Sequence, residues 1–340
     1  MKKILVTGGA GYIGSHTVVQ LYKSGYYPII MDNLSNSKSF IPERINQICN
    51  ASIPFYNLDC NDEQSYKIIK EKEGHIDGVI HFAAFKAVSE SVKKPIKYYQ
   101  NNIGSLTLLL KNFPNINCNK IVFSSSCTVY GQPDNLPVSE TSPIKHAESP
   151  YGYTKQVCEQ LLKDYTESHN VQAVILRYFN PIGAHESHLI GELPLGVPDN
   201  LIPYITQTGI GIREQLTVFG NNYDTPDGTC IRDFIHVIDL ANAHIKALEF
   251  MFNNTDVDID YFNIGTGVGN SVLEVINAFE DISNIKLNYI FGDRREGDIE
   301  QIWAETHKAS SKLNWSADKT IIDAMTDAWA WEQQLLKTKI

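Results

Sequence analysis

The sequence lacks any pair of cysteines spaced for a metal or redox motif. Its six cysteines are scattered along 340 residues and none stands in a Cys-x-x-Cys spacing, which argues against a zinc knuckle, a redox pair and a disulfide framework. We therefore expect reduced thiols in a cytoplasmic protein. His185 and His188 lie in a loop rich in proline and glycine with no third ligand evident, so we expect no metal site.

Long apolar runs and an excess of positive charge are also missing. The first apolar run stops at Thr7, too early for a signal peptide, and we expect no membrane span, because no later run is long enough. The 29 basic and 39 acidic side chains give a net charge of −10, which disfavours binding to nucleic acid or to anionic membranes. A small-molecule partner is the expectation that remains.

The sequence does contain short apolar runs that alternate with longer segments of helical period. The runs are nearly continuous in apolar residues, as strands covered on both faces should be, and they span residues 4–6, 28–31, 53–57, 78–82, 120–124 and 172–177. This pattern predicts an α/β fold with a doubly wound parallel (Rossmann) sheet of six strands. Prolines and glycines then break the alternation. We expect one domain over 1–180, with 235–252 packing back on it, and a second, smaller α/β domain that binds substrate over 181–340.

A glycine-rich turn follows the first expected strand. Gly8, Gly11 and Gly14 stand at the spacing that allows a tight turn, close approach of a pyrophosphate and close packing of the next helix. The second strand ends at Asp32, 18 residues after Gly14, where a carboxylate binds the adenosine ribose and repels a 2′-phosphate. A glycine triplet alone is weak evidence, but this order of strand, turn, helix and acid predicts NAD rather than NADP.

A tyrosine and a lysine four residues apart form the expected catalytic pair. Ser149 and Pro150 suit the cap and first position of a helix, and the spacing then places Tyr151 and Lys155 on one helix face. For Tyr151 to act as a base, its pKa must fall by about 3 units, or roughly 4 kcal/mol. Lys155 and a positive nicotinamide ring provide this only in a site shielded from water. Ser126, after the fifth strand, is expected to bind a substrate oxygen and share its proton with Tyr151.

These residues resemble the extended short-chain dehydrogenase/reductase family. Within it, the segments 32–37, 81–86, 177–185 and 294–298 look like the 4-epimerases that act on UDP-glucose and UDP-galactose, and the resemblance covers essentially the whole chain. It implies a homodimeric isomerase with tightly held NAD. Tyr151 would remove the proton of the sugar 4-hydroxyl while a hydride leaves carbon 4, and the 4-keto sugar would then turn over and recover the hydride on its other face.

The resemblance also implies two sets of binding residues. For NAD it points to Gly8, Gly11, Tyr12, Ile13, Gly14, Asp32, Asn33, Leu34, Ser35, Asn36, Ser37, Asp59, Cys60, Phe82, Ala83, Ala84, Phe85, Lys86, Asn101, Lys155 and Phe179. For the nucleotide sugar it points to Lys86, Ser126, Tyr151, Asn180, Asn200, Leu201, Phe219, Arg232, Arg295, Asp298 and Ile302. The two arginines suit a diphosphate because a guanidinium binds its oxygens as a fork.

Several alternatives stay open at this point. Ile302 stands where bacterial relatives often have tyrosine, so activity on UDP-N-acetylglucosamine and UDP-N-acetylgalactosamine is a hypothesis, as is epimerisation of a UDP-uronate. A nucleotide-sugar 4,6-dehydratase is disfavoured, because Cys127 and Thr128 stand where its acidic pair is expected. A redox-sensing module without turnover is disfavoured by the presence of Tyr151 and Lys155.

Overall fold

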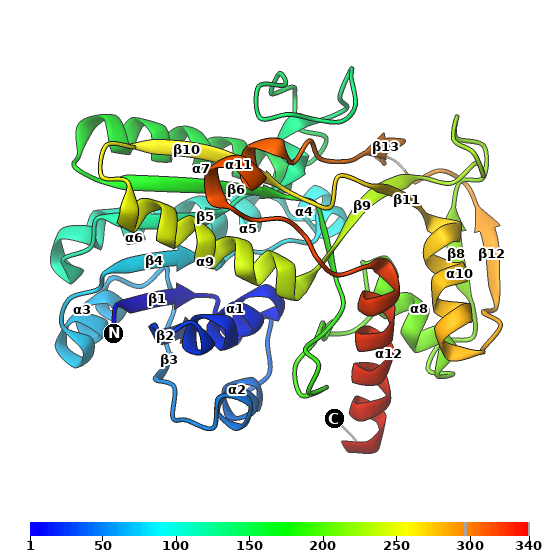
Figure 1. Cartoon of the computed structure of the whole chain (residues 1–340), viewed down its shortest axis with the longest axis horizontal. Helices are drawn as coiled ribbons and strands as arrows, with labels where there is room; N and C mark the ends of the chain where they lie inside the picture. The colour runs from blue at the N-terminus through cyan, green and yellow to red at the C-terminus, as the bar shows by residue number, and fades with distance from the viewer. Residues whose placement is uncertain (296–297, 339–340) are drawn as a thin grey trace.

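A seven-stranded parallel sheet forms the larger part of the molecule (Figure 1). The computed structural model describes residues 1–295 and 298–338. The strand order is β10-β6-β5-β4-β1-β2-β3, and the strands are β1 (Lys3–Thr7), β2 (Tyr27–Asp32), β3 (Phe55–Asn57), β4 (Gly78–His81), β5 (Lys120–Ser124), β6 (Gln172–Tyr178) and β10 (Ile259–Ile264). The predicted doubly wound α/β sheet is confirmed.

The prediction of six strands was wrong by one, because β10 comes from the second half of the chain. It pairs in parallel with β6 and forms one edge of the sheet. The apolar run of β10 is interrupted by Asp260. The Asp260 carboxylate accepts hydrogen bonds from Lys308 (2.6 Å) and Lys312 (3.2 Å). An edge strand tolerates such a charge, so β10 does not have the continuous apolar run of a central strand.

Two hydrophobic clusters cover the two faces of the sheet, and alternate strand residues point into each. In β1, Ile4 and Val6 enter one cluster and Leu5 enters the other. The first face is covered by α1 (Tyr12–Lys23), α2 (Ile41–Cys49), α9 (Val237–Asn253) and α11 (His307–Leu313). The second face is covered by α3 (Glu63–Glu73), α6 (Gly104–Ile116) and α7 (Pro150–Ser168). The helix expected over 237–252 is thus α9, which packs against α1, β5 and β6.

Short helical segments connect the central strands at the carboxyl edge of the sheet. Between β4 and α6 the chain forms α4 (Val88–Lys93), α5 (Pro95–Tyr98) and a π-helical turn, η1 (Tyr99–Ile103). After β5 it forms the 3-10 turn η2 (Cys127–Tyr130). Because all strands of this sheet run in parallel, these connections and the glycine turn after β1 meet at one edge.

A smaller part of the chain packs beside this edge (Figure 1). Its strands are β7 (Asn180–Ile182), β9 (Ile231–His236), β11 (Gly269–Ser271) and β13 (Gln301–Ile302), which form one sheet, and β8 (Leu216–Phe219) and β12 (Tyr289–Gly292), which form another. The helices α8 (Leu201–Gly209), α10 (Val272–Ser283) and α12 (Ile321–Thr338) enclose a third hydrophobic cluster. The chain passes between the two parts more than once, because β10 and α9 follow residue 180 in the sequence but pack in the larger part. The domain boundary at residue 180 stays a prediction.

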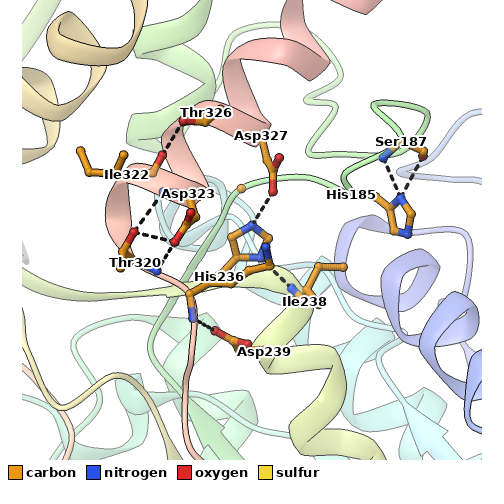
Figure 2. Close-up of polar contacts among 12 residues, drawn as sticks. His185, Ser187, His236, Ile238, Asp239, Thr320, Ile322, Asp323, Thr326 and Asp327 are labelled. Atoms are coloured by element: carbon orange, nitrogen blue, oxygen red, sulfur yellow. Dashed lines mark hydrogen bonds and ion pairs between the residues drawn. The ribbon is translucent and has the colours of Figure 1, made fainter.

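His236 joins α12 to the rest of the molecule (Figure 2). Its Nδ1 accepts the backbone N–H of Ile238 at 3.0 Å, so Nε2 carries the proton and donates to Asp327 of α12 at 3.1 Å. Gly183, with φ of +91°, lies so close that a Cβ there would come within 2.8 Å of the imidazole. The carbonyl of Gly183 accepts the hydroxyl of Tyr12 at 2.7 Å. His236 is thus hydrogen-bonded to α12 and packs closely against Gly183, whose carbonyl binds the first residue of α1.

None of the helices over residues 1–295 and 298–338 is both long and apolar enough to cross a membrane.

Candidate active site

The turn between β1 and α1 is built for close approach of a ligand to the backbone. Gly8 has φ of +71°, and a Cβ there would lie 2.8 Å from the backbone nitrogen of Ala83. A Cβ on Gly14 would lie 2.2 Å from the carbonyl oxygen of Gly8, so the helix start can pack on the turn only without a side chain. The free N–H groups of the first turn of α1 face this space, which favours an anion.

Asp32 lies at the end of β2, beside this turn. Its carboxylate accepts the backbone N–H groups of Ala10 at 3.0 Å and Leu34 at 2.8 Å. Burial raises the pKa of Asp32, and these N–H groups oppose that rise. The carboxylate is thus held in one orientation next to the glycine turn, and the turn and the acid together fit the diphosphate and ribose of a dinucleotide.

One continuous cleft of about 770 Å³ runs from the glycine turn across the carboxyl edge of the sheet to the smaller part of the chain. The predicted NAD residues on its wall are Gly8, Gly11, Tyr12, Ile13, Gly14, Asp32, Asn33, Ser35, Asn36, Ser37, Asp59, Cys60, Phe82, Ala83, Ala84, Phe85, Lys86, Asn101 and Lys155. The predicted sugar-nucleotide residues on it are Lys86, Tyr151, Asn180, Asn200, Arg232, Arg295, Asp298 and Ile302. The structure therefore brings both predicted sets into one cleft.

Five predicted residues lie beside this wall. Leu34, Phe179 and Leu201 pack into hydrophobic clusters, because their apolar side chains gain more from burial than from facing a polar cleft. Ser126 is buried, and its hydroxyl accepts the N–H of Thr128 at 3.3 Å. Phe219 is 46% exposed on β8, with the Arg295 guanidinium 5.7 Å from its ring centre. Their binding roles stay predictions, and Glu296 and Gly297 of the segment 294–298 lie outside the described residues.

Tyr151 and Lys155 lie on the buried face of α7, which begins as its sequence predicts. The Ser149 hydroxyl accepts the N–H of Gly152 at 3.1 Å, and Pro150 takes the first helical position. Lys155 donates to the carbonyl of Ser124 at 2.6 Å and lies 5.8 Å from the centre of the Tyr151 ring. The exposed fractions are 7% for Tyr151 and 3% for Lys155, so the two side chains are not an exposed surface pair.

Burial opposes the fall in the pKa of Tyr151 that we expect from Lys155 and a positive nicotinamide ring together. Burial raises the pKa of Tyr151 well above its ordinary value, Tyr178 adds to the rise, and a hydrogen bond with Ser126 opposes it. Burial also lowers the pKa of Lys155 to about 8. Burial thus outweighs the charge of Lys155 in setting the pKa of Tyr151. The protein's own groups favour a neutral tyrosine.

Two arginines share one carboxylate at the far end of the cleft. Arg295 donates to Asp298 at 2.9 Å, and a guanidinium nitrogen of Arg232 lies 3.7 Å from the same oxygen. Arg232 also donates to the carbonyls of Ile231 and Glu300 at 2.9 and 3.3 Å. Asp199, also on the cleft wall, is a second carboxylate near Arg295. This end of the cleft therefore offers two guanidinium groups that can bind a diphosphate, rather than a net positive charge.

Glu192 and Tyr178 are among the polar residues on the cleft wall that sequence reasoning missed. Glu192 accepts hydrogen bonds from Lys86 at 2.8 Å and Asn200 at 2.6 Å, but it lies in an irregular loop, where no periodic pattern marks it. Tyr178 lies within 2.7 Å of the Ser124 hydroxyl. Tyr178 could have been predicted from the sequence, because it ends β6 and polar residues at the carboxyl ends of parallel strands face the edge where ligands bind.

His185 makes hydrogen bonds within its own loop. His185 accepts the N–H of Ser187 at 3.1 Å (Figure 2), so its Nδ1 is used within its own loop. Within the part of the chain that the structure describes, no group of three or more histidine, cysteine, aspartate or glutamate side chains is arranged to hold a metal ion.

The fold and the cleft together define a dinucleotide-binding α/β protein with a buried tyrosine and lysine. The family model described as GDP-mannose 4,6 dehydratase matches residues 5–328. The UDP-glucose 4-epimerase of Bacillus subtilis (strain 168) is 48% identical over 330 residues, which are 97% of this chain and 96% of the relative. The chain therefore belongs to the UDP-glucose 4-epimerase family, within the extended short-chain dehydrogenases/reductases.

Two solved structures are similar over nearly the whole chain. The first is UDP-glucose 4-epimerase from Stenotrophomonas maltophila with bound NAD and formylated UDP-arabinopyranose. It has a TM-score of 0.96 and 42% identity, over 99% of this chain and 100% of that one. The second is the enzyme from Bifidobacterium longum in complex with NAD+ and UDP, with a TM-score of 0.93 and 43% identity over 98% of each chain.

Proposed function

We propose that this protein interconverts UDP-glucose and UDP-galactose by a transient oxidation at carbon 4 of the sugar. The observation that carries the proposal is the single cleft, because it joins the glycine turn and Asp32 at one end, Tyr151 and Lys155 in the middle, and Arg232 and Arg295 at the other. Relatives with this activity cover nearly the whole chain, and two similar structures were solved with NAD.

NAD fits the first end of the cleft. The glycine turn offers backbone N–H groups and close approach to a diphosphate, and Asp32 is held beside it by two backbone hydrogen bonds. When bound, NAD would supply a hydride acceptor that later returns the hydride, so that the net reaction involves no change of redox state. Because no second substrate has to restore the cofactor, it has no need to leave between turnovers.

Tyr151 is the proposed acid and base at carbon 4. As the phenolate it takes the proton of the sugar 4-hydroxyl when the hydride leaves carbon 4, and as the resulting phenol it returns that proton when the opposite face is reduced. Lys155 is anchored on the carbonyl of Ser124 at 2.6 Å, and in its charged form it stabilises the phenolate of Tyr151. Ser126, whose hydrogen bond opposes the rise of the Tyr151 pKa, is the proposed relay of the proton between sugar and tyrosine.

The end of the cleft with Arg232 and Arg295 is the proposed site of the UDP diphosphate. Arg232 is fixed by two backbone carbonyls, so only part of its guanidinium is free to bind phosphate, while Arg295 is 49% exposed on its side chain and more accessible. Anchoring at the nucleotide leaves the hexose free to turn after oxidation, as an exchange of faces at carbon 4 requires.

Incubation of the purified protein with UDP-galactose, without added NAD, tests this proposal. We expect UDP-glucose to form and an equilibrium between the two sugars to be reached, because the cofactor stays with the protein. No conversion, even after NAD is added back, would refute the assignment.

The six cysteines are free, which supports the predicted cytoplasmic setting. The homodimer also stays a prediction, and light scattering of the same preparation tests it.

A further inference from the structure

A third polar residue continues the line of Tyr151 and Lys155 along α7. Glu159 stands one further turn on, so the three side chains share a helix face. Only 6% of Glu159 is exposed, and it lies behind the cleft wall. Its two carboxylate oxygens accept from Arg177 of β6, with Nε at 3.0 Å and Nη2 at 2.6 Å. This is a buried ion pair with the two-bond geometry that guanidinium and carboxylate favour.

The ion pair holds the peptide that carries the catalytic serine. Ser125 is fully buried, and its hydroxyl donates to Glu159 at 2.5 Å. Its neighbour on one side, Ser124, provides the carbonyl that binds Lys155, and its neighbour on the other side is Ser126. The backbone N–H of Ser125 also donates to the carbonyl of Leu176 at 2.9 Å. The hydroxyl of the middle residue therefore adds a side-chain bond, behind the segment, that helps to hold both the anchor of Lys155 and the Ser126 hydroxyl in place.

The same network continues to the far side of the serine segment. Arg177 also donates to the hydroxyl of Tyr130 at 3.1 Å, at the end of the 3-10 turn that follows Ser126. That hydroxyl donates to Asn263 of β10 at 2.6 Å, and Asn263 donates to the carbonyl of Val138 at 2.8 Å. The segment from Ser124 to Tyr130 is thus bound near its start by Glu159 and at its end by Arg177, the two members of one ion pair.

We propose that Glu159 and Arg177 are positioning residues of the epimerase reaction, which set the serine segment against Tyr151 and Lys155 through the hydroxyl of Ser125. The inference rests on the proposed function, since it concerns the same proton relay. Neither residue was assigned by sequence reasoning, although Arg177 begins the segment 177–185 that carries part of the family resemblance.

Glu159 also contributes charge to the site. The groups that face Lys155 are Tyr151, Cys158 and Glu159 on α7 and His81 on β4. Burial lowers the pKa of Lys155 to about 8, while Cys158 and Glu159 raise it. Removal of the Glu159 charge therefore lowers the pKa of Lys155 further, and the charged lysine is lost at a lower pH.

Ser125→Ala and Glu159→Gln test the proposal in the full-length protein with its bound cofactor. Ser125→Ala removes one hydrogen bond and leaves the ion pair intact. Glu159→Gln keeps the shape but removes the charge. Glu332→Gln is the matched control, because Glu332 is equally buried on α12, where it accepts from Thr206 at 2.9 Å. For each variant, kcat and KM for UDP-galactose, the pH profile of kcat, the bound NAD and the melting temperature are measured.

For Ser125→Ala we expect kcat to fall at least about tenfold, because a misplacement of about 1 Å costs roughly 100-fold, with KM and bound NAD unchanged. For Glu159→Gln we expect a fall at least as large, and an alkaline limb of the pH profile that moves to lower pH. Glu332→Gln should keep the kcat and pH profile of the wild type.

Two results would overturn the inference. One is a folded Ser125→Ala protein with wild-type kcat, which stays decisive if Glu159→Gln does not fold. The other is a Glu159→Gln protein in which only the melting temperature changes, as in the control, because a purely structural role predicts that result. A wild-type protein inactive on UDP-galactose would instead overturn the proposed function, and the inference with it.

Discussion

Replacement of Lys155 by methionine tests the electrostatic part of the account most sharply. Methionine keeps the length and the apolar stem of lysine but removes its charge, which lies 5.8 Å from the centre of the Tyr151 ring. At an effective dielectric of about 20, a unit charge at this distance is worth about 3 kcal/mol, or roughly 2 units in the pKa of Tyr151. We expect kcat at pH 7 to fall about 100-fold in Lys155→Met.

The pH profile separates this effect from a general loss of structure. Because burial places the pKa of Lys155 at about 8, wild-type kcat should decline above that pH as the lysine loses its charge. Lys155→Met should lack this decline, and its rate should rise with pH as Tyr151 ionises. The assay is conversion of UDP-galactose per mole of bound NAD, since Lys155 also lines the cofactor end of the cleft. The control is Lys163→Met, at an exposed position on the same helix. A Lys155→Met protein that keeps both the kcat and the pH profile of the wild type would refute the reasoning.

Three further predictions follow from the same geometry. Asp32→Asn should bind NAD at least about tenfold more weakly, because hydrogen bonds to a charged group are lost, and it should discriminate less against NADP; unchanged retention of NAD after dialysis would contradict this. Ile302 is 2% exposed on the cleft wall, so the larger tyrosine side chain in Ile302→Tyr should leave less room for an N-acetyl group. Turnover of UDP-N-acetylgalactosamine should then fall relative to turnover of UDP-galactose, and an unchanged ratio of the two rates would exclude Ile302 as the residue that controls this preference. Burial lowers the pKa of His16 and His81 to about 3 and that of His244 to about 4, so the unfolded chain takes up protons first as the pH falls below about 6.5. Each histidine should then cost about 2 kcal/mol of folding stability between pH 7 and pH 5, and urea unfolding curves that coincide at the two values would refute this.

The sheet and the cofactor end of the site could be predicted because they follow from local rules. Central parallel strands are apolar on both faces, and a glycine turn needs glycine whatever surrounds it, so β1 with Gly8 and Gly14 is visible in the sequence. The strand β10 was missed because an edge strand admits Asp260. Its place in the sheet depends on pairing with β6, which is distant in the sequence.

The electrostatics of the site could not be predicted from residue spacing. The four-residue interval correctly placed Tyr151 and Lys155 together, but the sign of their pKa shifts depends on burial by elements from the whole chain. Arg177 and Glu192 were missed as polar partners for a related reason. Arg177 meets Glu159 only when β6 and α7 pack, and Glu192 meets Lys86 only when an irregular loop folds over the cleft.

The role of Tyr151 is the central claim, and the turnover of Tyr151→Phe tests it most directly. The substitution removes one oxygen from a side chain that is 7% exposed, so fold and bound NAD should be kept, and both are measured together with the rate. The account predicts that conversion of UDP-galactose to UDP-glucose slows by about 100-fold to 10,000-fold, the usual contribution of a positioned acid or base. Conversion at the wild-type rate by a Tyr151→Phe protein with its full content of NAD would contradict it.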